Sequence, residues 1–112
     1  MAFVRKKRLG GYEYYQLVEN RWIDGKSRQR VLLHLGRYSD IEVALKEWPG
    51  AIERLGRFAQ REREKAERLA EDPSSRARSR AARDRATKAE RRAGALAANL
   101  KKLHDLKGQG VV

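Results

Sequence analysis

The sequence predicts an α+β protein, in which a three-stranded antiparallel β-meander with a packing helix is followed by a long antiparallel helical hairpin. Aromatic and β-branched residues fill the first third of the chain in short runs separated by glycine turns. After Gly36 the apolar residues recur about every 3.6 positions, which is the period of an α-helix. Two longer segments with coiled-coil-like apolar seams lie on either side of Asp72-Pro73. These three observations decide the fold class.

Two glycine-containing dipeptides divide the β-rich segment into strands. Gly10-Gly11 and Asp24-Gly25 tolerate the positive φ angles of tight hairpin turns. The strands are therefore expected at residues 3–9, 12–23 and 26–35. In the second hairpin, a two-residue turn places Val18 opposite Val31. A three-residue bulged loop places Leu17 there instead, and the sequence leaves both registers open.

Alternation along the third expected strand assigns its residues to two faces, and this assignment does not depend on the turn. The apolar face, expected to pack against the helix, contains Val31, Leu33 and Leu35. The opposite face, expected to point away from the helix, contains Arg28, Arg30, Leu32 and His34.

The first helix is indicated by apolar residues at the spacing i, i+3, i+4 and i+7, namely Ile41, Ala44, Leu45 and Trp48. Ser39 and Glu42 have the spacing of a capping box, so the helix is expected to begin near Asp40. Pro49-Gly50 is expected to end or kink it. Trp48 is expected in the core, as is Phe58 further along the chain.

The helical hairpin is predicted from two seams with alternating spacings of three and four. The first contains Ile52, Leu55, Ala59, Glu62, Ala66 and Leu69, and the second contains Ala82, Ala86, Ala89, Ala93, Leu96, Leu100 and Leu103. Between them, Asp72 is a good N-cap and Pro73 suits the first helical position. Two such helices joined by a short connection pack as an antiparallel hairpin. Its alanine-rich seam buries little apolar area, so the hairpin alone gains little stability from packing. A homodimer that packs through the hairpin is therefore an open alternative.

The expected organisation has three parts. Residues 1–48 form a sheet plus helix, interpreted as a nucleic-acid-binding module. Residues 49–107 form the helical hairpin, and residues 108–112 are expected to be a disordered tail. No apolar run has the length of a signal peptide or a membrane span. We therefore expect a cytoplasmic protein without a membrane partner.

The charge of the chain favours a polyanionic partner. Its 27 Lys and Arg residues outnumber 15 Asp and Glu residues, for a net charge of +12. The excess lies in residues 1–36 and 73–112, on either side of a nearly neutral segment. Cysteine is absent, so the chain has no disulfide framework and no thiolate zinc site.

The primary nucleic-acid contact is expected on the outward sheet face and the neighbouring strand. Its candidate residues are Lys6, Lys7, Arg8, Arg21, Trp22, Lys26, Arg28, Arg30 and His34. Guanidinium forks on a β-ribbon bind phosphates or guanine edges, and aromatic rings stack on bases. The alternative is a solvated sheet face whose charges prevent edge-to-edge aggregation. Trp22 either closes the end of the sheet or contacts a base.

A second basic run lies on the last helix. The expected secondary phosphate contacts are Arg76, Arg80, Arg83 and Arg91, although such runs are more often solvated helix faces.

The two histidines, His34 and His104, have no further ligands at metal-binding spacing, so no metal or cofactor is expected. No nucleophile constellation, phosphate-cradling glycine loop or dinucleotide fingerprint is present. We therefore expect no enzymatic activity and no small-molecule substrate.

Six short stretches of the sheet segment form a recognisable pattern: Phe3-Val4-Arg5, Tyr12 to Tyr15, Leu17-Val18-Glu19, Asp24-Gly25-Lys26, Arg28-Gln29-Arg30 and Leu33-His34-Leu35-Gly36. This pattern resembles the N-terminal segment of bacterial insertion-sequence transposases of the acidic-triad class, and of short bacterial proteins that share that segment. The pattern covers about a third of the chain. The resemblance implies a region that binds DNA ends. At the level of fold, the predicted sheet and helix also resemble integrase arm-binding domains.

The resemblance does not extend to catalysis. A ribonuclease-H-like catalytic domain needs a large mixed sheet with three separated acids, which the residues after Gly36 do not provide. The chain is thus interpreted as a stand-alone relative of the N-terminal module, fused to a helical hairpin. Its expected role is that of a non-enzymatic DNA-binding accessory or regulatory protein. The alternatives are an RNA-binding protein and a protein-interaction or self-association adaptor built on the hairpin.

Overall fold

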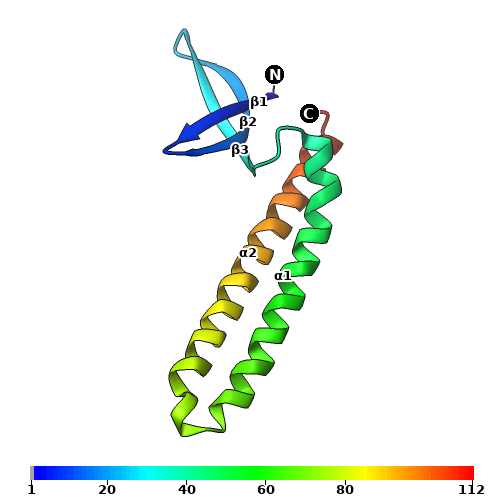
Figure 1. Ribbon diagram of the computed structural model, residues 1–112. Coiled ribbons are helices and arrows are strands. Elements are labelled where there is room, and N and C mark those ends of the chain that lie inside the picture. The colour runs from blue at the N-terminus through cyan, green and yellow to red at the C-terminus, as the bar shows by residue number, and fades with distance from the viewer. Residues whose placement is uncertain (1) are drawn as a thin grey trace. The chain divides into compact units, whose positions relative to one another are not determined.

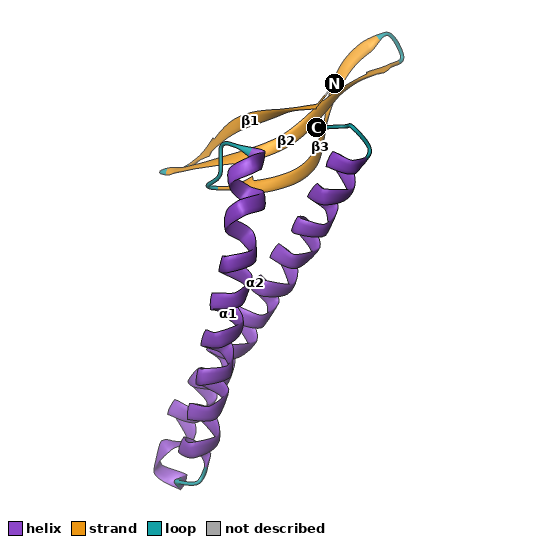
Figure 2. Cartoon of the chain, turned by 90° about the vertical axis from the view of Figure 1, so that its right-hand side faces the viewer, coloured by secondary structure: helices purple, strands orange, loops and turns teal. Residues whose placement is uncertain are grey.

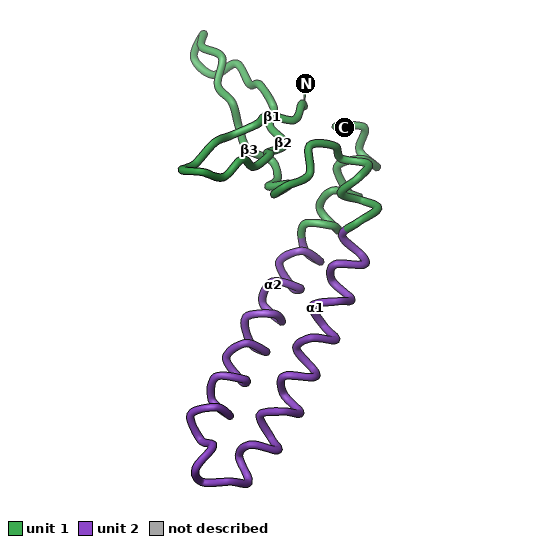
Figure 3. The backbone as a smooth tube through the Cα atoms, in the orientation of Figure 1, with its two compact units in different colours: residues 1–47, 99–112 green, residues 48–98 purple. Residues whose placement is uncertain are grey.

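The computed structural model describes residues 2–112, and these residues confirm the predicted α+β class (Figure 1). The elements follow in the order β1 (Ala2–Leu9), β2 (Tyr12–Ile23), β3 (Lys26–Gly36), α1 (Ile41–Ala70), the 3₁₀ turn η1 (Pro73–Ser75) and α2 (Arg76–Gly108). The chain divides into two compact units (Figure 3). Residues 1–47 and 99–112 form the first, and residues 48–98 form the second.

The first unit contains an antiparallel sheet with the strand order β1-β2-β3. Asp24 and Gly25 have φ angles of 53° and 75°, and Ile23 pairs with Lys26, so the second hairpin has a two-residue turn. Of the two registers that the sequence leaves open, the structure therefore has the one with Val18 opposite Val31.

The β2–β3 hairpin continues beyond β1. Within the described residues, the pairing of β1 with β2 begins at Ala2 and Glu19. From this point outward, β2 and β3 form a two-stranded segment, residues 19–30, which we call the ribbon. Figure 2 shows it reaching away from the remainder of the sheet. All ribbon residues except Glu19 are exposed.

Two β-bulges interrupt the pairing of β3 with β2. Val18 pairs with Val31 and Leu17 pairs with Leu33, so Leu32 is an extra residue in β3. At the second bulge Gln16 pairs with His34 and Tyr15 pairs with Gly36, so Leu35 is an extra residue in β3. Each extra residue reverses the alternation of β3, so the side chains before and after it lie on different faces from those that regular alternation predicts.

The core of the first unit is formed where the sheet meets the helix ends. Its buried apolar residues are Leu17, Val18, Leu33, Leu35, Ala44 and Leu103. A hollow lined by Val4, Asp40 and Lys107 places one sheet face beside the start of α1 and the end of α2. The ammonium group of Lys107 also lies 2.6 Å from a carboxylate oxygen of Glu42.

Helix α1 begins where the sequence predicts but is capped differently. The Glu42 amide donates to Oδ1 of Asp40 at 2.9 Å, and the Ala44 amide donates to the Asp40 carbonyl oxygen. Asp40 is therefore the N-cap, and the capping box predicted at Ser39 is wrong. The aspartate carboxylate, one residue later in the chain, accepts the bond that the Ser39 hydroxyl was expected to accept.

Pro49 lies inside α1, which runs without interruption from Ile41 to Ala70. The expectation that Pro49-Gly50 ends the first helix is therefore wrong. Proline removes one backbone hydrogen bond, at a cost of about 3 kcal/mol in a helix interior. Burial of apolar residues before and after it offsets this cost, because Trp48 is only 2% exposed and Leu55 packs against the hairpin core.

In the second unit α1 and α2 lie side by side and antiparallel. Its core contains Ala59, Ala86 and Ala89, with Leu55 and Phe58 packed against them. Arg63 is paired with Glu90 across the hairpin, and Arg85 with Glu62 at 3.1 Å. Of the predicted α2 seam, Ala82, Ala86, Ala89 and Leu103 are buried and the other members half-buried, so the seam is confirmed as the inner face.

The connection between the helices is capped as predicted. Oδ1 of Asp72 accepts from the Ser74 amide at 3.0 Å, and Pro73 occupies the first position of η1. Hydrogen bonds from Ser74 hold the pKa of the Asp72 carboxyl below its usual value.

At the other end of α2, the Gly110 amide donates to the Lys107 carbonyl oxygen and the Val111 amide donates to the Leu106 carbonyl oxygen.

Candidate nucleic-acid interface

The register brings four cations together on one face of the ribbon. Directly paired residues of antiparallel strands project on the same side of the sheet. Arg21 pairs with Arg28, and Ile23 pairs with Lys26. Arg30 pairs with Glu19, two residues before Arg21 on β2. We call the face with Arg21, Lys26, Arg28 and Arg30 the cationic face.

His34 does not belong to the cationic face. It pairs with Gln16, whereas Arg28 and Arg30 share the face of Leu17 and Leu33. The prediction that Arg28, Arg30 and His34 project together is therefore wrong. The physical reason is the bulge at Leu32, because one extra residue reverses the alternation between Val31 and Leu33. For the same reason Val31, 38% exposed, lies on the face opposite to buried Leu33.

The opposite face of the ribbon is uncharged. Asn20 pairs with Gln29, and Trp22 pairs with Ser27. The Trp22 side chain is 78% exposed, so it does not close the end of the sheet. The two faces of the ribbon thus differ in chemistry, with cations on one and amide, hydroxyl and indole groups on the other.

Most of the positive charge on the cationic face is not neutralised. Arg21 Nε lies 3.1 Å from a carboxylate oxygen of Glu19. No carboxylate within the described residues lies within 4.0 Å of Lys26, Arg28 or Arg30. Arg21 and Arg28 are also like charges directly opposite each other, an arrangement that destabilises a sheet. A bound anion removes this repulsion.

The basic run of β1 lies at the far end of the sheet from the ribbon. Lys6 and Arg8 both bind Glu13, at 3.4 Å and 2.7 Å, and the Arg8 hydrogen bond is the main cause that lowers the pKa of Glu13. Arg8 pairs with Glu13, eight residues from Arg21 along β2, or about 26 Å at the rise of a strand. Lys7 pairs with Tyr14 and projects to the other face.

A polar network that the sequence analysis did not identify lies on the face of His34. Arg5 donates to Oε1 of Gln16 at 2.8 Å and also to Oε1 of Gln29. The Gln16 amide nitrogen lies 3.4 Å from Nδ1 of His34. These side chains belong to all three strands, so only the three-stranded register brings them together. His34 therefore lies beside Gln16 and Arg5, on the face opposite to the cationic face.

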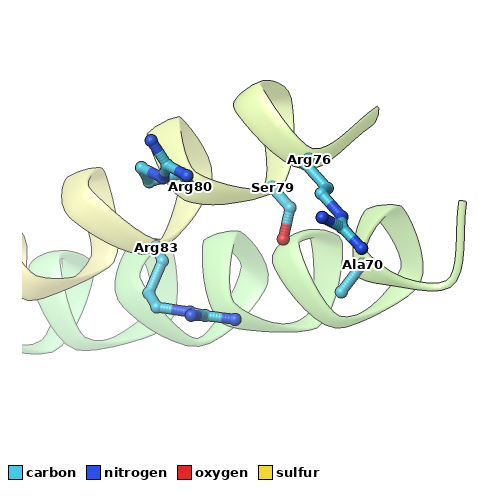
Figure 4. Close-up of a pocket in the computed structure, with 5 residues that line it drawn as sticks. All are labelled: Ala70, Arg76, Ser79, Arg80 and Arg83. Atoms are coloured by element: carbon cyan, nitrogen blue, oxygen red, sulfur yellow. The ribbon is translucent and has the colours of Figure 1, made fainter. Parts of the chain in front are cut away.

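The predicted secondary contacts on α2 are partly brought together. Arg76, Arg80 and Arg83 line one hollow with Ala70 and Ser79 (Figure 4). Arg91 is exposed and does not line this hollow.

Across residues 2–112 no group of three or more potential metal ligands is found. No helix in the same range has the length and apolar character needed to cross a membrane.

A family model for the N-terminal domain of IS1634 family transposases matches residues 2–94, which is more than four fifths of the chain. The chain belongs to the IS1634 transposase N-terminal domain family. No curated protein and no solved structure matches it.

Membership of the IS1634 N-terminal domain family confirms the resemblance noted in the sheet segment and extends it. The matched region includes all of α1 and more than half of α2, whereas the resemblance covered only the three strands. The interpretation of the helical hairpin as a part fused to the family segment is therefore wrong, because the hairpin lies largely within the IS1634 N-terminal domain.

Proposed function

We propose that this chain is a non-enzymatic, cytoplasmic DNA-binding accessory or regulatory protein that contacts duplex DNA through the cationic face of the ribbon. The observation that carries the proposal is the grouping of Arg21, Lys26, Arg28 and Arg30 on one exposed face. Three of these four cations have no carboxylate within 4.0 Å in the described part of the chain.

The dimensions of a two-stranded ribbon suit the DNA major groove, which is about 12 Å wide and admits such a ribbon. Arginine on its surface binds phosphate oxygens or donates two hydrogen bonds to O6 and N7 of guanine. All ribbon residues except Glu19 are exposed, so their side chains are accessible to a partner. Trp22, on the opposite face, has an exposed ring that can stack on an unpaired or distorted base.

Family membership supports the same proposal, since transposases act on DNA and the matched domain is their N-terminal one. The net charge of +12 adds long-range attraction to a polyanion. Titration with DNA and with RNA distinguishes DNA binding from RNA binding and from a purely protein-interaction role of the hairpin.

The test is a titration of the full chain with duplex DNA, single-stranded DNA and structured RNA over a range of salt concentrations. If all four cations of the face contact phosphates, log affinity falls with log salt at a slope of about −3.6 on duplex DNA. The double variant Arg28→Ala, Arg30→Ala should reduce the magnitude of this slope by about 1.8 and leave the circular dichroism spectrum unchanged.

A matched control keeps the loss of charge constant. Arg61 and Arg68 are exposed on α1 and have no ion-pair partner in residues 2–112. The variant Arg61→Ala, Arg68→Ala should therefore affect binding less than the ribbon variant does. Equal effects of the two variants would refute the ribbon as the site. Tighter binding of structured RNA would reassign the ligand, and absence of nucleic-acid binding would favour the adaptor role.

A further inference from the structure

A second group of unneutralised cations lies at the turn of the helical hairpin. Arg76, Arg80 and Arg83 have the spacing i, i+4 and i+7, so they lie along one side of α2. Together with Ala70 and Ser79 they line a hollow of about 240 Å³. Figure 4 shows the side chains of Arg76 and Arg83 extending toward α1, whereas the side chain of Arg80 lies on the side of α2 away from α1.

None of the three arginines is paired with a carboxylate among the residues that the structure describes. Asp72 is occupied as the cap of η1, where it accepts bonds from Ser74 and Ser75. Glu67 lies beside Arg83 in a neighbouring hollow without approaching it within 4.0 Å. Asp84 is four residues after Arg80 and forms no ion pair with any residue in the range 2–112 either.

This arrangement is unfavourable for an isolated helix. Like charges at i, i+3 and i, i+4 destabilise a helix. Cations in its first turns also oppose the helix dipole, whose positive end is at the N-terminus. An anion bound in the hollow would reduce both penalties, because its negative charge lies close to the arginines that line the hollow and interacts favourably with the dipole.

We infer that this hollow, the Arg76 hollow, is a second phosphate-binding site that receives a phosphate of a nucleic-acid backbone. Guanidinium groups bind phosphate oxygens through charge-assisted, often bidentate hydrogen bonds. A water molecule takes about 30 Å³ of liquid, so 240 Å³ has room for a phosphate group and some of its water.

A polymer phosphate is favoured over a small free anion by the surroundings of the hollow. Further exposed cations continue along α2 beyond it, among them Lys88, Arg91 and Arg92. None of these three has an ion-pair partner within the described chain. A backbone that carries many phosphates can contact such a row, whereas a single free anion gains nothing from it. The inference shares with the proposed function the premise that the chain binds nucleic acid.

The first experiment compares two triple variants of the full chain in duplex DNA titrations. The triple variant Arg76→Gln, Arg80→Gln, Arg83→Gln removes the three positively charged side chains that line the hollow. Arg54→Gln, Arg61→Gln, Arg68→Gln removes the same charge from exposed, unpaired positions on α1. At low salt the first variant should weaken binding about tenfold or more, with the slope reduced by about 0.9 for each phosphate lost. The second should weaken it clearly less.

A second measurement detects the anion directly. In titrations of the parent chain with inorganic phosphate, saturable shifts of the arginine Nε–H resonances should include Arg76, Arg80 and Arg83 and should be absent from Arg54, Arg61 and Arg68 of α1. Uniform shifts over all arginines, or equal losses of DNA affinity in the two triple variants, would overturn the inference. Circular dichroism melts of both variants confirm that α2 is folded.

The variants also separate this inference from the proposed function. If Arg28→Ala, Arg30→Ala binds like the parent while the Arg76 hollow variant has lost affinity, the ribbon proposal fails and the hollow remains. If the ribbon variant loses affinity and the hollow variant does not, the hollow is refuted and the ribbon proposal remains.

Discussion

The bulge at Leu32 predicts that two neighbouring apolar residues of β3 contribute very differently to stability. Regular alternation would place Val31 and Leu33 in the same core. In the structure Leu33 is 4% exposed, whereas Val31 is 38% exposed and lies on the other face. Truncation of a buried leucine to alanine costs about 2–5 kcal/mol. Val31→Ala removes less area and leaves no cavity, so we expect a cost of about 1 kcal/mol or less, mainly from lost β-propensity.

Urea denaturation of Leu33→Ala and Val31→Ala gives both free energies of unfolding from midpoints and slopes. The difference should be at least about 1 kcal/mol, or roughly 4–8 °C in melting temperature for a domain near this size. Leu9→Ala, at a side chain that is 71% exposed, is the control for truncation at the surface. Equal costs for Val31 and Leu33 would refute the bulged register and restore simple alternation.

Three further predictions concern the cap at Asp72, the proline inside α1 and the exposure of the two tryptophans. Hydrogen bonds from Ser74 lower the pKa of Asp72, so its contribution to stability is present above about pH 4 and is lost as the pH falls through the lowered pKa. Asp72→Asn should flatten the pH dependence of the free energy of unfolding in that range, and an unchanged dependence would contradict this. Pro49→Ala should raise the free energy of unfolding by roughly 1–3 kcal/mol, because it restores a hydrogen bond within α1; a lower melting temperature would show that the proline ring is needed. Acrylamide should quench Trp22, 78% exposed, but not Trp48, 2% exposed, and duplex DNA should protect Trp22 if the ribbon lies against it.

Local patterns predicted most of the fold. The Asp24-Gly25 turn, the α2 seam and the Asp72-Pro73 cap each depend on residues within a few positions of one another, and each is present in the structure. Predictions failed where distant contacts outweigh a local preference. Pro49 remains helical because apolar residues are buried on both sides of it.

The candidate site could be predicted by residue type but not by grouping. Charge and turn chemistry identified the arginines of the ribbon, and all of them are exposed. Their assignment to faces depends on where β3 carries an extra residue, and no dipeptide marks that position. Arg5 of β1 and Gln29 of β3 are separated by two hairpin turns, so their hydrogen bond could be predicted only from the full register of the sheet.

On the face that carries the ribbon arginines, the residues that stabilise the fold are different from the residues proposed to bind DNA, so binding can be tested by mutation without unfolding the sheet. Leu17 and Leu33 lie at the base of the face that carries Arg28 and Arg30 further out. The leucines are buried, whereas the arginines are exposed and have no ion-pair partner within residues 2–112. Truncation of these arginines removes a repulsion with Arg21 and no packing, so the folded state should be unaffected or slightly stabilised. A loss of DNA affinity in such a variant can therefore be attributed to the missing guanidinium groups rather than to unfolding.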